Sequence, residues 1–583
     1  MSMVTLNING DAVQVPEGTS IYKAALQKNT KIPVLCYHPD LPAWAACGIC
    51  VVKIEGSSKL VRACATNVAE GMNVITHDPE LHQVRKTTIE LILSTHPNSC
   101  LTCPRNQRCE LQRLAADFGI REIPFEMNLQ EIEKDHSTPS IVLDPEKCVK
   151  CGRCVNVCQQ MQDVYALEFI GRGDEVRMAP AGDIALNESP CIKCGQCSAH
   201  CPVGAIYERD DTQSVFRGLR DKSKHSVVQV APAVRVAIGE EFGYDPGEIT
   251  TGKLYAALRR LGFDTVFDTN FAADLTIMEE ATEFVHRFVK GSGPIPMVTT
   301  CCPSWVDYME KFYPEMIPHF STAKSPQMML AAMTKTYFAE KLGKTADEVF
   351  HVSVMPCTSK KYEIARGDDM YSSGAQDIDV SITTRELARM IKSAGIDFRA
   401  LHEEEADTAL GIYSGAGTIF GATGGVMEAA IRSAHYFVTG RNMEKVDFEP
   451  VRGLEGVKTG VVDLDGTEVR VAVAHSISNV RTVIDDIKRA IDNGEEPPYH
   501  FVEVMACRGG CIGGGGQPYS TTDEVRRKRI GGLYNDDTAS KVRCSHDNPQ
   551  IKALYSEFLG EPLGEKSHEL LHTHYTARKL YQR

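Results

Sequence analysis

Apolar and polar residues alternate at the N-terminus of the chain, which predicts a small β-rich domain. The alternation runs over residues 4–8 and again over 13–15, with the sequence Asn-Gly-Asp between them. An Asn-Gly pair between two alternating segments is typical of a β-hairpin. A helix is expected next, near residues 20–27.

From about residue 222 onward, short apolar runs typical of strands alternate with amphipathic stretches typical of helices. The strand candidates are 226–230, 296–300, 351–355, 469–475 and 501–505, and the helix candidates include 253–261 and 384–394. Thr383 and Glu386 have the spacing of a capping box at the start of the last of these helices. The alternation predicts a multidomain α/β protein whose large later domain has largely parallel sheets.

Composition and charge narrow the class of protein. The chain has 583 residues, enough for several domains, and a net charge of -14, which argues against nucleic acid as a partner. The N-terminus lacks the charged and apolar regions of a secretion signal, and no apolar run is long enough to span a bilayer. We therefore expect a cytoplasmic protein without direct membrane insertion.

The 21 cysteines change this picture most. In a large cytosolic protein, clustered cysteines indicate metal sites more often than disulfides. Two runs with the spacing C-x2-C-x2-C-x3-C form the strongest signal and the one internal repeat. They are Cys148, Cys151, Cys154 and Cys158, and Cys191, Cys194, Cys197 and Cys201.

In two-cluster ferredoxins, the fourth cysteine of each such run ligates the other 4Fe–4S cluster. One expected cluster therefore uses Cys148, Cys151, Cys154 and Cys201, and the other uses Cys191, Cys194, Cys197 and Cys158. The first run has Gln159 where proline is usual, but proline is not a ligand. A pair of zinc sites is the alternative, and the ferredoxin spacing argues against it.

Two weaker groups precede these runs. The first consists of Cys36, Cys47, Cys50 and Cys64. Its place after a hairpin and a helix favours a 2Fe–2S cluster of the plant-ferredoxin kind, although the spacing differs, and the Cys47 and Cys50 pair alone also suits zinc or a redox dithiol. The second consists of His96, Cys100, Cys103 and Cys109. It suits zinc or a 4Fe–4S cluster with one histidine ligand, and its position between two redox domains favours the cluster.

Three further cysteine motifs each follow a strand candidate in the second half of the chain. They contain Cys301 with Cys302, then Cys357, then Cys507 with Cys511. Ligands at the carboxyl ends of strands in an open α/β sheet converge on one crevice. The glycines after Cys511 would let backbone approach an inorganic cluster without Cβ clashes.

With their flanking residues, these motifs resemble the three signatures of the iron-only (FeFe) hydrogenases. The matching sequences are TTCCPSW at 299–305, MPCTSKKYE at 355–363 and EVMACRGGCIGGGGQP at 503–518. The N-terminal cluster regions also resemble the large, clostridial-type members, so the resemblance covers essentially the whole chain. It implies reversible interconversion of H2 with two protons and two electrons.

The resemblance also implies the cofactors. One 2Fe–2S and three accessory 4Fe–4S clusters would lead to an H-cluster, a 4Fe–4S cubane joined to a two-iron unit with carbon monoxide, cyanide and a dithiolate amine. The ligands of the cubane would be Cys302, Cys357, Cys507 and Cys511, and Cys511 would bridge to the two-iron unit.

Roles in proton transfer and in the pocket follow from the same resemblance. Protons would pass through Cys301, Glu280, Ser321, Glu283 and Arg287, with Cys301 unligated. Lys360 would donate a charge-assisted hydrogen bond to a cyanide. Pro232, Ala233, Gln327, Met355 and Met505 would line the pocket around the two-iron unit. Some family members carry Ser at the position of Ala233, so one hydrogen bond to cyanide is expected to be missing here.

The resulting domain organisation has five parts. They are a plant-ferredoxin-like 2Fe–2S domain at 1–78, a His/Cys3 4Fe–4S domain at 79–140, a bacterial-ferredoxin-like domain with two 4Fe–4S clusters at 141–215, the H-cluster catalytic domain at 222–520, and a C-terminal segment at 521–583 packed on the catalytic domain.

Without the resemblance, most of these residues have simpler explanations. Glu280 and Glu283 would lie on a solvated helix face with Arg287 paired to Glu283, Lys360 would be a surface lysine, and Met355 and Met505 would be core residues. Cys544 is interpreted as structural or incidental. The tail histidines are expected to serve packing and hydrogen bonding rather than to bind a metal; they are His568, His572 and His574.

Two other functions compete with hydrogenase. An electron-transfer subunit of the NADH-dehydrogenase type would explain the chain up to about residue 215, but not the three later motifs. A hydrogenase-derived sensory or assembly protein tends to lose relay residues such as Cys301, which this chain keeps. One expected partner is ferredoxin. The alternative is a set of flavoprotein NAD(P)-linked subunits in a larger complex, which could be electron-bifurcating. Maturation proteins for the two-iron unit are expected in either case.

Overall fold

The N-terminal sheet contains the predicted hairpin in the computed structural model, which describes residues 2–582. The strands lie in the order β2-β1-β5-β3-β4 and are β1 Met3–Ile8, β2 Asp11–Pro16, β3 Val51–Ile54, β4 Val61–Arg62 and β5 Asn73–Ile75. Asn9 and Gly10 both have positive φ, 53° and 90°, and close the two-residue turn between β1 and β2. Helix α1, Ile21–Gln27, begins at Ser20, whose Oγ accepts from the Lys23 N–H, so the expected helix is confirmed.

Two helices follow the N-terminal sheet. Helix α2, Pro79–Ser94, begins at Asp78, and Pro79 occupies the first helical position, where a missing N–H removes no hydrogen bond. Helix α3, Glu110–Asp117, begins at Cys109. In the loop before α3, Arg108 Nη1 donates to Glu241 Oε1 at 2.6 Å, which ties this region to the larger lobe.

The two cysteine runs lie between two small antiparallel sheets. Strand β6, Ile141–Leu143, pairs with β9, Ile206–Glu208, and β7, Leu167–Ile170, pairs with β8, Arg177–Pro180. Helices α4, Arg153–Asn156, and α5, Gln196–His200, begin at equivalent glycines. Gly152 and Gly195 have φ of 79° and 72°. In each run, a glycine in the left-handed region joins the cysteine loop to the helix that follows, so the sequence repeat is also a structural repeat.

Two four-stranded sheets form the frame of the larger lobe. The first, in the order β11-β10-β13-β14, is entirely parallel and consists of β10 His225–Val230, β11 Thr265–Asp268, β13 Val349–Met355 and β14 Val380–Thr383. The second, in the order β12-β17-β16-β15, consists of β12 Met297–Val298, β15 Val457–Leu464, β16 Thr467–His475 and β17 Phe501–Met505. Only its β15–β16 pair is antiparallel, so the expectation of largely parallel sheets is confirmed.

Helices surround both sheets. Those before β15 are α6 Thr212–Arg220, α7 Thr251–Leu261, α8 Thr269–Lys290, α9 Pro303–Phe312, α10 Pro326–Met333, α11 Ala339–Lys341, α12 Lys360–Glu363, α13 Thr384–Ser393, α14 Gly415–Ile419 and α15 Gly425–Thr439. Those after it are α16 Ile477–Asp492, α17 Asp523–Ala539, α18 Pro549–Leu554 and α19 Glu565–Leu571. None of the described helices combines the length and apolar character needed to cross a bilayer.

The strand expected at 296–300 is shorter than predicted, and the other four strand candidates are confirmed. Strand β12 ends at Val298, and Thr299 turns its Oγ1 to accept from the Val504 N–H at 3.1 Å. The capping box at the start of α13 is present, with Thr383 and Glu386 bonding each other's backbone N–H groups. Local spacing therefore located these elements, while a tertiary contact set the end of β12.

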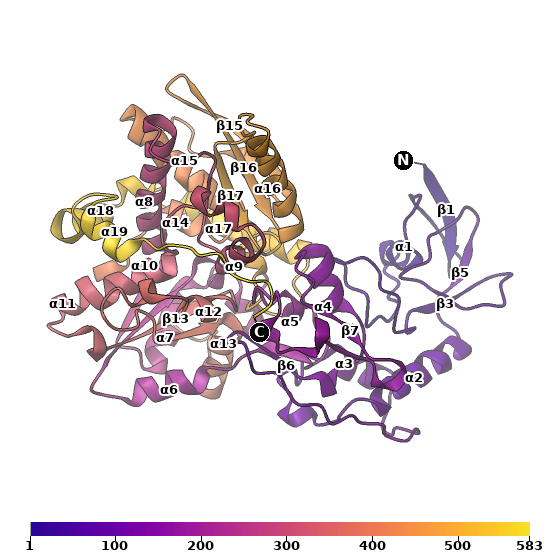
Figure 1. Cartoon of the computed structure of the whole chain (residues 1–583). Helices are drawn as coiled ribbons and strands as arrows, with labels where there is room; N and C mark the ends of the chain where they lie inside the picture. Colours follow the sequence, from indigo (N-terminus) through magenta and orange to yellow (C-terminus); the bar gives the residue numbers. More distant parts are fainter. Residues whose placement is uncertain (1, 583) are drawn as a thin grey trace.

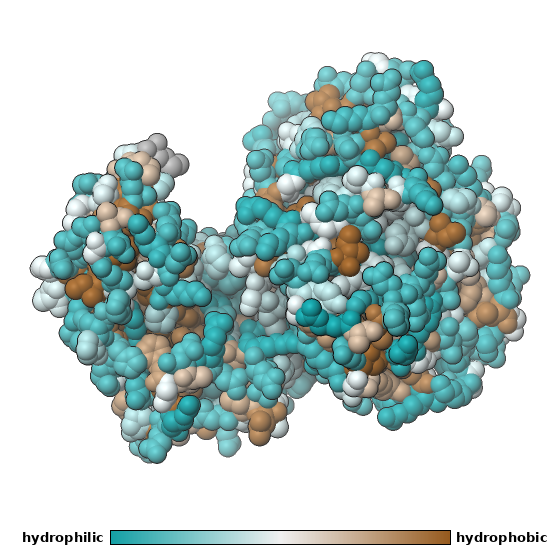
Figure 2. All heavy atoms as spheres, turned by 180° about the vertical axis from the view of Figure 1, so that it is seen from behind, coloured by the Kyte–Doolittle hydropathy of each residue, from teal (hydrophilic) through white to brown (hydrophobic). Residues whose placement is uncertain are grey.

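The chain forms a small N-terminal lobe beside a large lobe that contains both four-stranded sheets (Figure 1). The view from behind shows a notch between the two lobes (Figure 2). The C-terminal tail returns to the junction, where the Gln582 N–H donates to the Glu188 carbonyl at 2.9 Å. The C-terminal tail thus contacts the segment just before the second cysteine run.

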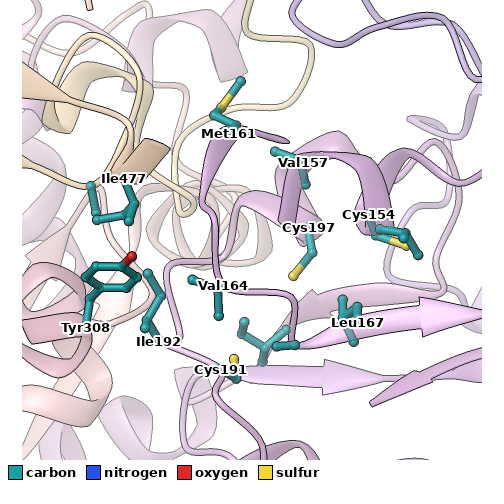
Figure 3. Close-up of a cluster of buried hydrophobic side chains, with 14 of the residues drawn as sticks. Cys154, Val157, Met161, Val164, Leu167, Cys191, Ile192, Cys197, Tyr308 and Ile477 are labelled. Carbon is teal, nitrogen blue, oxygen red and sulfur yellow. The ribbon is translucent and has the colours of Figure 1, made fainter. Parts of the chain in front are cut away.

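An apolar core joins the cysteine runs to the large lobe. Ile192, in the second run, packs near Tyr308 of α9 and Ile477 of α16, while Cys191 and Cys197 face the interior of the same cluster (Figure 3). This cluster extends continuously from Leu35 in the N-terminal region to Ala506 beyond β17. The accessory region and the large lobe therefore share one hydrophobic core.

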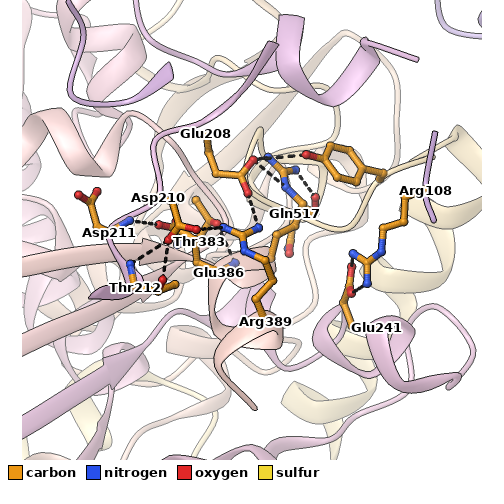
Figure 4. A network of polar contacts seen from close by, with 12 residues as sticks. Arg108, Glu208, Asp210, Asp211, Thr212, Glu241, Thr383, Glu386, Arg389 and Gln517 are labelled. Atoms are coloured by element: carbon orange, nitrogen blue, oxygen red, sulfur yellow. Dashed lines mark hydrogen bonds and ion pairs between the residues drawn. The ribbon is translucent and has the colours of Figure 1, made fainter. Parts of the chain in front are cut away.

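A buried ion-pair network reinforces this junction. Glu208, at the end of β9, pairs with Arg385 of α13 at 2.7 Å and with Arg389 at 2.9 Å (Figure 4). Burial alone would raise the pKa of Glu208, but the two guanidinium groups lower it below the ordinary value. Arg385 also donates to the carbonyls of Gly515 and Gln517 at 2.8 and 2.5 Å.

Arg385→Met is expected to destabilise the protein by about 3–5 kcal/mol, because it leaves a buried carboxylate and two carbonyls short of donors. The matched variant Arg389→Met removes a side chain that is 40% exposed and should cost clearly less. Thermal unfolding of both variants checks this. Equal shifts in the unfolding midpoint would contradict the assignment of Arg385 as the central contact.

Candidate cluster sites and candidate active site

The two cysteine runs exchange their fourth members between two cavities. One cavity is lined by Cys148, Cys151, Cys154 and Cys201, and the other by Cys158, Cys191, Cys194 and Cys197. Burial raises the pKa of Cys148 to about 11 and that of Cys158 to about 12. Four buried or half-buried thiols around one apolar cavity fit a 4Fe–4S cluster, whose iron would compensate the charge of the thiolates.

In the N-terminal domain, four thiols lie within reach of one another. Cys36 contacts both Cys47 and Cys64, and the sulfur atoms of Cys50 and Cys64 are 3.3 Å apart. Cys36 and Cys47 come from the long loop between α1 and β3, and Cys64 follows β4. This arrangement fits the donor set expected for a 2Fe–2S cluster.

The group around His96 is more open. His96 is buried after α2, burial lowers its pKa to about 4, and its Nδ1 has no hydrogen-bond partner among the described residues. Cys103 and Cys109 lie near each other, and Cys100 belongs to the same loop. A neutral imidazole with a free buried nitrogen beside thiols suits metal ligation.

A central cavity collects the cysteines of the three later motifs. It is lined by Cys301, Cys302, Cys357, Cys507 and Cys511, together with Pro232, Ala233, Gln327, Met355, Lys360 and Met505. All eleven of these residues were named from the sequence, and they are among the 21 residues that line the cavity.

The cavity lies where two sheets end, rather than at one sheet. Cys357 follows β13 of the first sheet, whereas Cys302 and Cys507 follow β12 and β17 of the second. Burial raises the pKa of Cys357 to about 12, and it raises those of Cys302 and Cys507 as well. The donor set fits a cluster whose iron compensates buried thiolates.

The glycines after Cys511 also lie against protein backbone, and their approach to a cluster stays a prediction. A Cβ on Gly514 would lie 2.2 Å from the Pro356 carbonyl oxygen, and one on Gly515 would lie 2.4 Å from that of Cys194. Both glycines therefore permit close approach of protein backbone, including that of an accessory cysteine loop. Gly510 and Gly514 also line the cavity.

Lys360 is buried, so the alternative of a surface lysine is wrong. Its Nζ donates to Glu363 Oε2 at 2.8 Å and to the Cys301 carbonyl at 3.2 Å. Burial opposes the charge, but Glu363 outweighs it and raises the pKa of Lys360. Glu363 also accepts from Gln327 and Ser325 at 2.8 and 3.0 Å. It therefore positions two residues that line the cavity, Lys360 and Gln327.

The predicted relay residues also meet. Glu280 and Glu283 of α8 are 1% and 8% exposed, so the alternative of a solvated helix face is wrong. The Ser321 hydroxyl contacts both carboxylates and donates to Glu283 Oε2 at 3.2 Å. Arg287 Nη2 donates to Glu283 Oε1 at 2.5 Å, and Cys301 lies near Glu280 at the cavity end.

Burial raises the pKa of Glu280 to about 8; the Ser321 hydroxyl opposes this shift, and the Glu283 and Glu503 carboxylates add to it. Glu280 Oε2 has no partner among the residues that the structure describes. At neutral pH this carboxyl therefore retains its proton.

Sequence reasoning missed two buried carboxylates. No role was predicted for Glu363 from the sequence, although it lies three residues after Lys360 on the same helix turn. Glu503 is fully buried and accepts from the Gly424 and Met427 N–H groups, both at 2.7 Å, at the start of α15. Both lie inside the recognised motifs, but their partners come from distant segments.

Five segments of the chain match known families. Residues 224–515 match the iron only hydrogenase large subunit, C-terminal domain, and 523–578 match the iron hydrogenase small subunit. Residues 1–79 match a 2Fe-2S iron-sulfur cluster binding domain, 85–124 the NADH-ubiquinone oxidoreductase-G iron-sulfur binding region, and 147–205 a 4Fe-4S dicluster domain.

The chain belongs to the iron-only hydrogenase family. It is 46% identical to the NADP-reducing hydrogenase subunit HndD of Solidesulfovibrio fructosivorans, over 99% of this chain and 100% of that protein. It is 42% identical to iron hydrogenase 1 of Clostridium pasteurianum, over 98% of this chain and 100% of that protein. This hydrogenase is therefore an oxidoreductase that acts on hydrogen and contains iron–sulfur centres.

A solved structure supports the same assignment. The apo form of [FeFe]-hydrogenase HydA1 from Chlamydomonas reinhardtii is 44% identical to this hydrogenase and superposes with a TM-score of 0.56. The match covers 64% of this chain and 100% of that chain. The recognition made from the three motifs is confirmed.

The buried Glu280 should make the stability of this hydrogenase fall as the pH rises. In the unfolded chain the carboxyl ionises near its ordinary pKa of 4.5, but in the folded protein it ionises near 8, so folding favours the protonated form between these values. Glu280→Gln should therefore raise the unfolding midpoint more at pH 8.5 than at pH 6. The exposed variant Glu495→Gln is the control, and a pH-independent effect of Glu280→Gln would contradict the shifted pKa.

Proposed function

We propose that this hydrogenase interconverts H2 with two protons and two electrons at the central cavity. Cys302, Cys357, Cys507 and Cys511 would hold the H-cluster cubane there, with Cys511 also bridging to the two-iron unit. When bound, the H-cluster supplies an open iron position at which electrons and protons meet. The observation that carries this proposal is the convergence of these four thiols with Cys301 and Lys360 around one buried cavity.

Electrons would arrive through the accessory clusters, one 2Fe–2S and three 4Fe–4S. The loop of the second cysteine run supports this route, because Gln196 Nε2 donates to Cys507 Sγ at 3.2 Å and to the Gly513 carbonyl at 3.0 Å. Cys194 lies near Cys507, and Gly515 packs against the Cys194 carbonyl. An accessory ligand loop is thus in direct contact with a ligand of the central site.

Protons would move between Cys301 and the surface through Glu280, Ser321, Glu283 and Arg287. Among the cysteines of the cavity, Cys301 is the one that we do not propose as an iron ligand. Its thiol lies near Glu280. Glu280 carries a proton at neutral pH and can pass it to the thiol or to the Ser321 side. Lys360 would hold a cyanide through its ammonium group while Glu363 fixes its position.

Cys301→Ala should lower H2 production and uptake by at least about 100-fold, because it removes the proton-transfer group nearest the cavity. Infrared bands of metal-bound carbon monoxide and cyanide should remain, which shows that the site is still loaded. Cys544→Ala, a buried cysteine outside the cavity, is the control and should keep full activity. Absence of these bands from the matured wild-type protein would overturn the hydrogenase site itself.

For electron exchange, we propose an NAD(P)-linked flavoprotein partner in a hetero-oligomer, with ferredoxin as the second electron carrier. The full-length similarity to a relative named as an NADP-reducing hydrogenase subunit supports this choice. Maturation proteins would insert the two-iron unit.

The partner proposal predicts that flavin-containing subunits co-purify with the native enzyme and that the complex couples H2 to NAD(P). The chain purified alone should exchange electrons with ferredoxin but not with NADH or NADPH. Spectroscopic flavin content and H2-dependent NAD(P) reduction measure the two parts. A native enzyme that purifies as a single subunit and is fully active with ferredoxin would contradict the partner proposal.

A further inference from the structure

The C-terminal tail enters the protein beside the proposed proton relay. The Thr573 N–H donates to the Thr322 carbonyl at 2.9 Å, and the Lys324 N–H donates to the Leu571 carbonyl at 2.8 Å. His572 lies between these bonds and forms a bridge with Ala323. The tail is therefore fixed against the segment that contains Ser321.

His572 connects two carboxylates of α8. Its Nε2 is 3.1 Å from Glu279 Oε2, and its Nδ1 is 2.8 Å from Thr322 Oγ1. Thr322 in turn contacts Glu283 Oε2 through Oγ1 at 3.3 Å and through its N–H at 3.1 Å. A continuous chain of hydrogen bonds thus runs from Glu279 through His572 and Thr322 to the outer carboxylate of the relay.

This chain has one proton too few when the imidazole is neutral. It contains three hydrogen bonds with a carboxylate at each end, and ionised carboxylates only accept. A neutral imidazole and a hydroxyl supply two protons, whereas an imidazolium and a hydroxyl supply three. With both carboxylates ionised, all three bonds are complete only when His572 carries an extra proton.

Glu279, which contacts His572, is held by further donors. Glu279 also accepts from the Tyr555 hydroxyl and from the Leu563 N–H at 2.8 Å, so its carboxylate is already supplied with donors. Glu279 of α8 contacts the imidazole directly, and Glu283 of the same helix lies on the far side of Thr322.

Positive groups lie further out. Arg287 pairs with the far side of Glu283, and the Lys324 ammonium binds the Leu570 carbonyl. His568 stacks on His572 with ring centroids 4.4 Å apart and is exposed. Solvent therefore reaches the residue that stacks on the buried imidazole.

We propose that His572 loads protons into the relay: it takes a proton from the solvent side and passes one through the Thr322 hydroxyl to Glu283. This inference rests on the relay in the proposed function and adds a second entrance besides Arg287.

In the transfer, the Nδ1–H of the imidazolium moves to Thr322 Oγ1 while the hydroxyl proton moves to Glu283 Oε2. His572 becomes neutral, Glu283 becomes neutral, and Thr322 is unchanged in composition. One proton from the solvent side then restores the imidazolium, and H2 oxidation would run the same steps in reverse. No electron moves in any of these steps.

The test uses the matured enzyme and His572→Gln, since glutamine can donate and accept hydrogen bonds but cannot carry the extra proton. H2 production should fall roughly tenfold at pH 6, and the ratio of wild-type to variant rates should approach one by pH 9, where an imidazole is neutral. Thr322→Val should give the same ratio, and the double variant should be no worse than either single variant.

His574→Gln is the matched control, because His574 lies in the same tail but pairs with Asp369 and is exposed. Its rate should equal that of the wild type at every pH. A second readout is the infrared pH-difference spectrum of enzyme with 15N-labelled histidine, in which His572→Gln should lose one imidazolium band that His574→Gln retains.

A rate loss that is the same at every pH, or no loss at all, would overturn the loading role. If His572→Gln lacks the infrared bands of metal-bound carbon monoxide and cyanide, its rate cannot be interpreted. Thr322→Val then provides the test, because it leaves the contact between His572 and Glu279 in place. Glu280→Gln distinguishes failure of the relay from failure of the loading role. Full activity of Glu280→Gln would overturn the relay itself. Loss of activity in Glu280→Gln, with wild-type behaviour of His572→Gln and Thr322→Val, would overturn only the loading role.

Discussion

Removal of cysteine sulfur from water is the constraint on which the rest of the structure depends. The thiols of both accessory cavities and of the central cavity are buried or half-buried, and burial raises the pKa of thiols such as Cys148, Cys158 and Cys357. Thiolates in such places need a compensating positive charge. Iron supplies that charge in this family, so the fold has to bring four sulfurs together before any of them is well accommodated.

The same constraint explains how tightly the cluster regions are joined. The cavity of the first run is also lined by Cys201 of the second run, and the cavity of the second run is also lined by Cys158 of the first. Gln196 then contacts Cys507, and Gly515 accepts the backbone of Cys194. Short contacts between ligand loops leave little room for independent domain motion, as suits a path for electrons.

Charge on the proton side follows a different rule. Helix α8 places Glu279, Glu280 and Glu283 on its buried side, where each needs donors or a proton. Glu280 meets this need with a raised pKa, Glu283 with Arg287 and Ser321, and Glu279 with Tyr555 and His572. One helix thus buries three carboxyls, and each is accommodated in a different way.

The sequence by itself determined the local elements, the cysteine groups and the family. Alternation gave the hairpin of β1 and β2, capping gave α13, and the spacing of the three motifs named every cysteine of the central cavity. These are properties of neighbouring residues, because turns, caps and ligand loops depend on residues only a few positions apart.

Only the tertiary structure decided which distant groups share an environment. It buried Glu280, Glu283 and Lys360, which local sequence would leave in solvent, and it showed that Gly514 and Gly515 admit protein backbone. It also placed His572, 250 residues after Thr322, in hydrogen-bond contact with it. Burial and long-range pairing arise when separate segments pack together, so no local pattern around these residues can determine them.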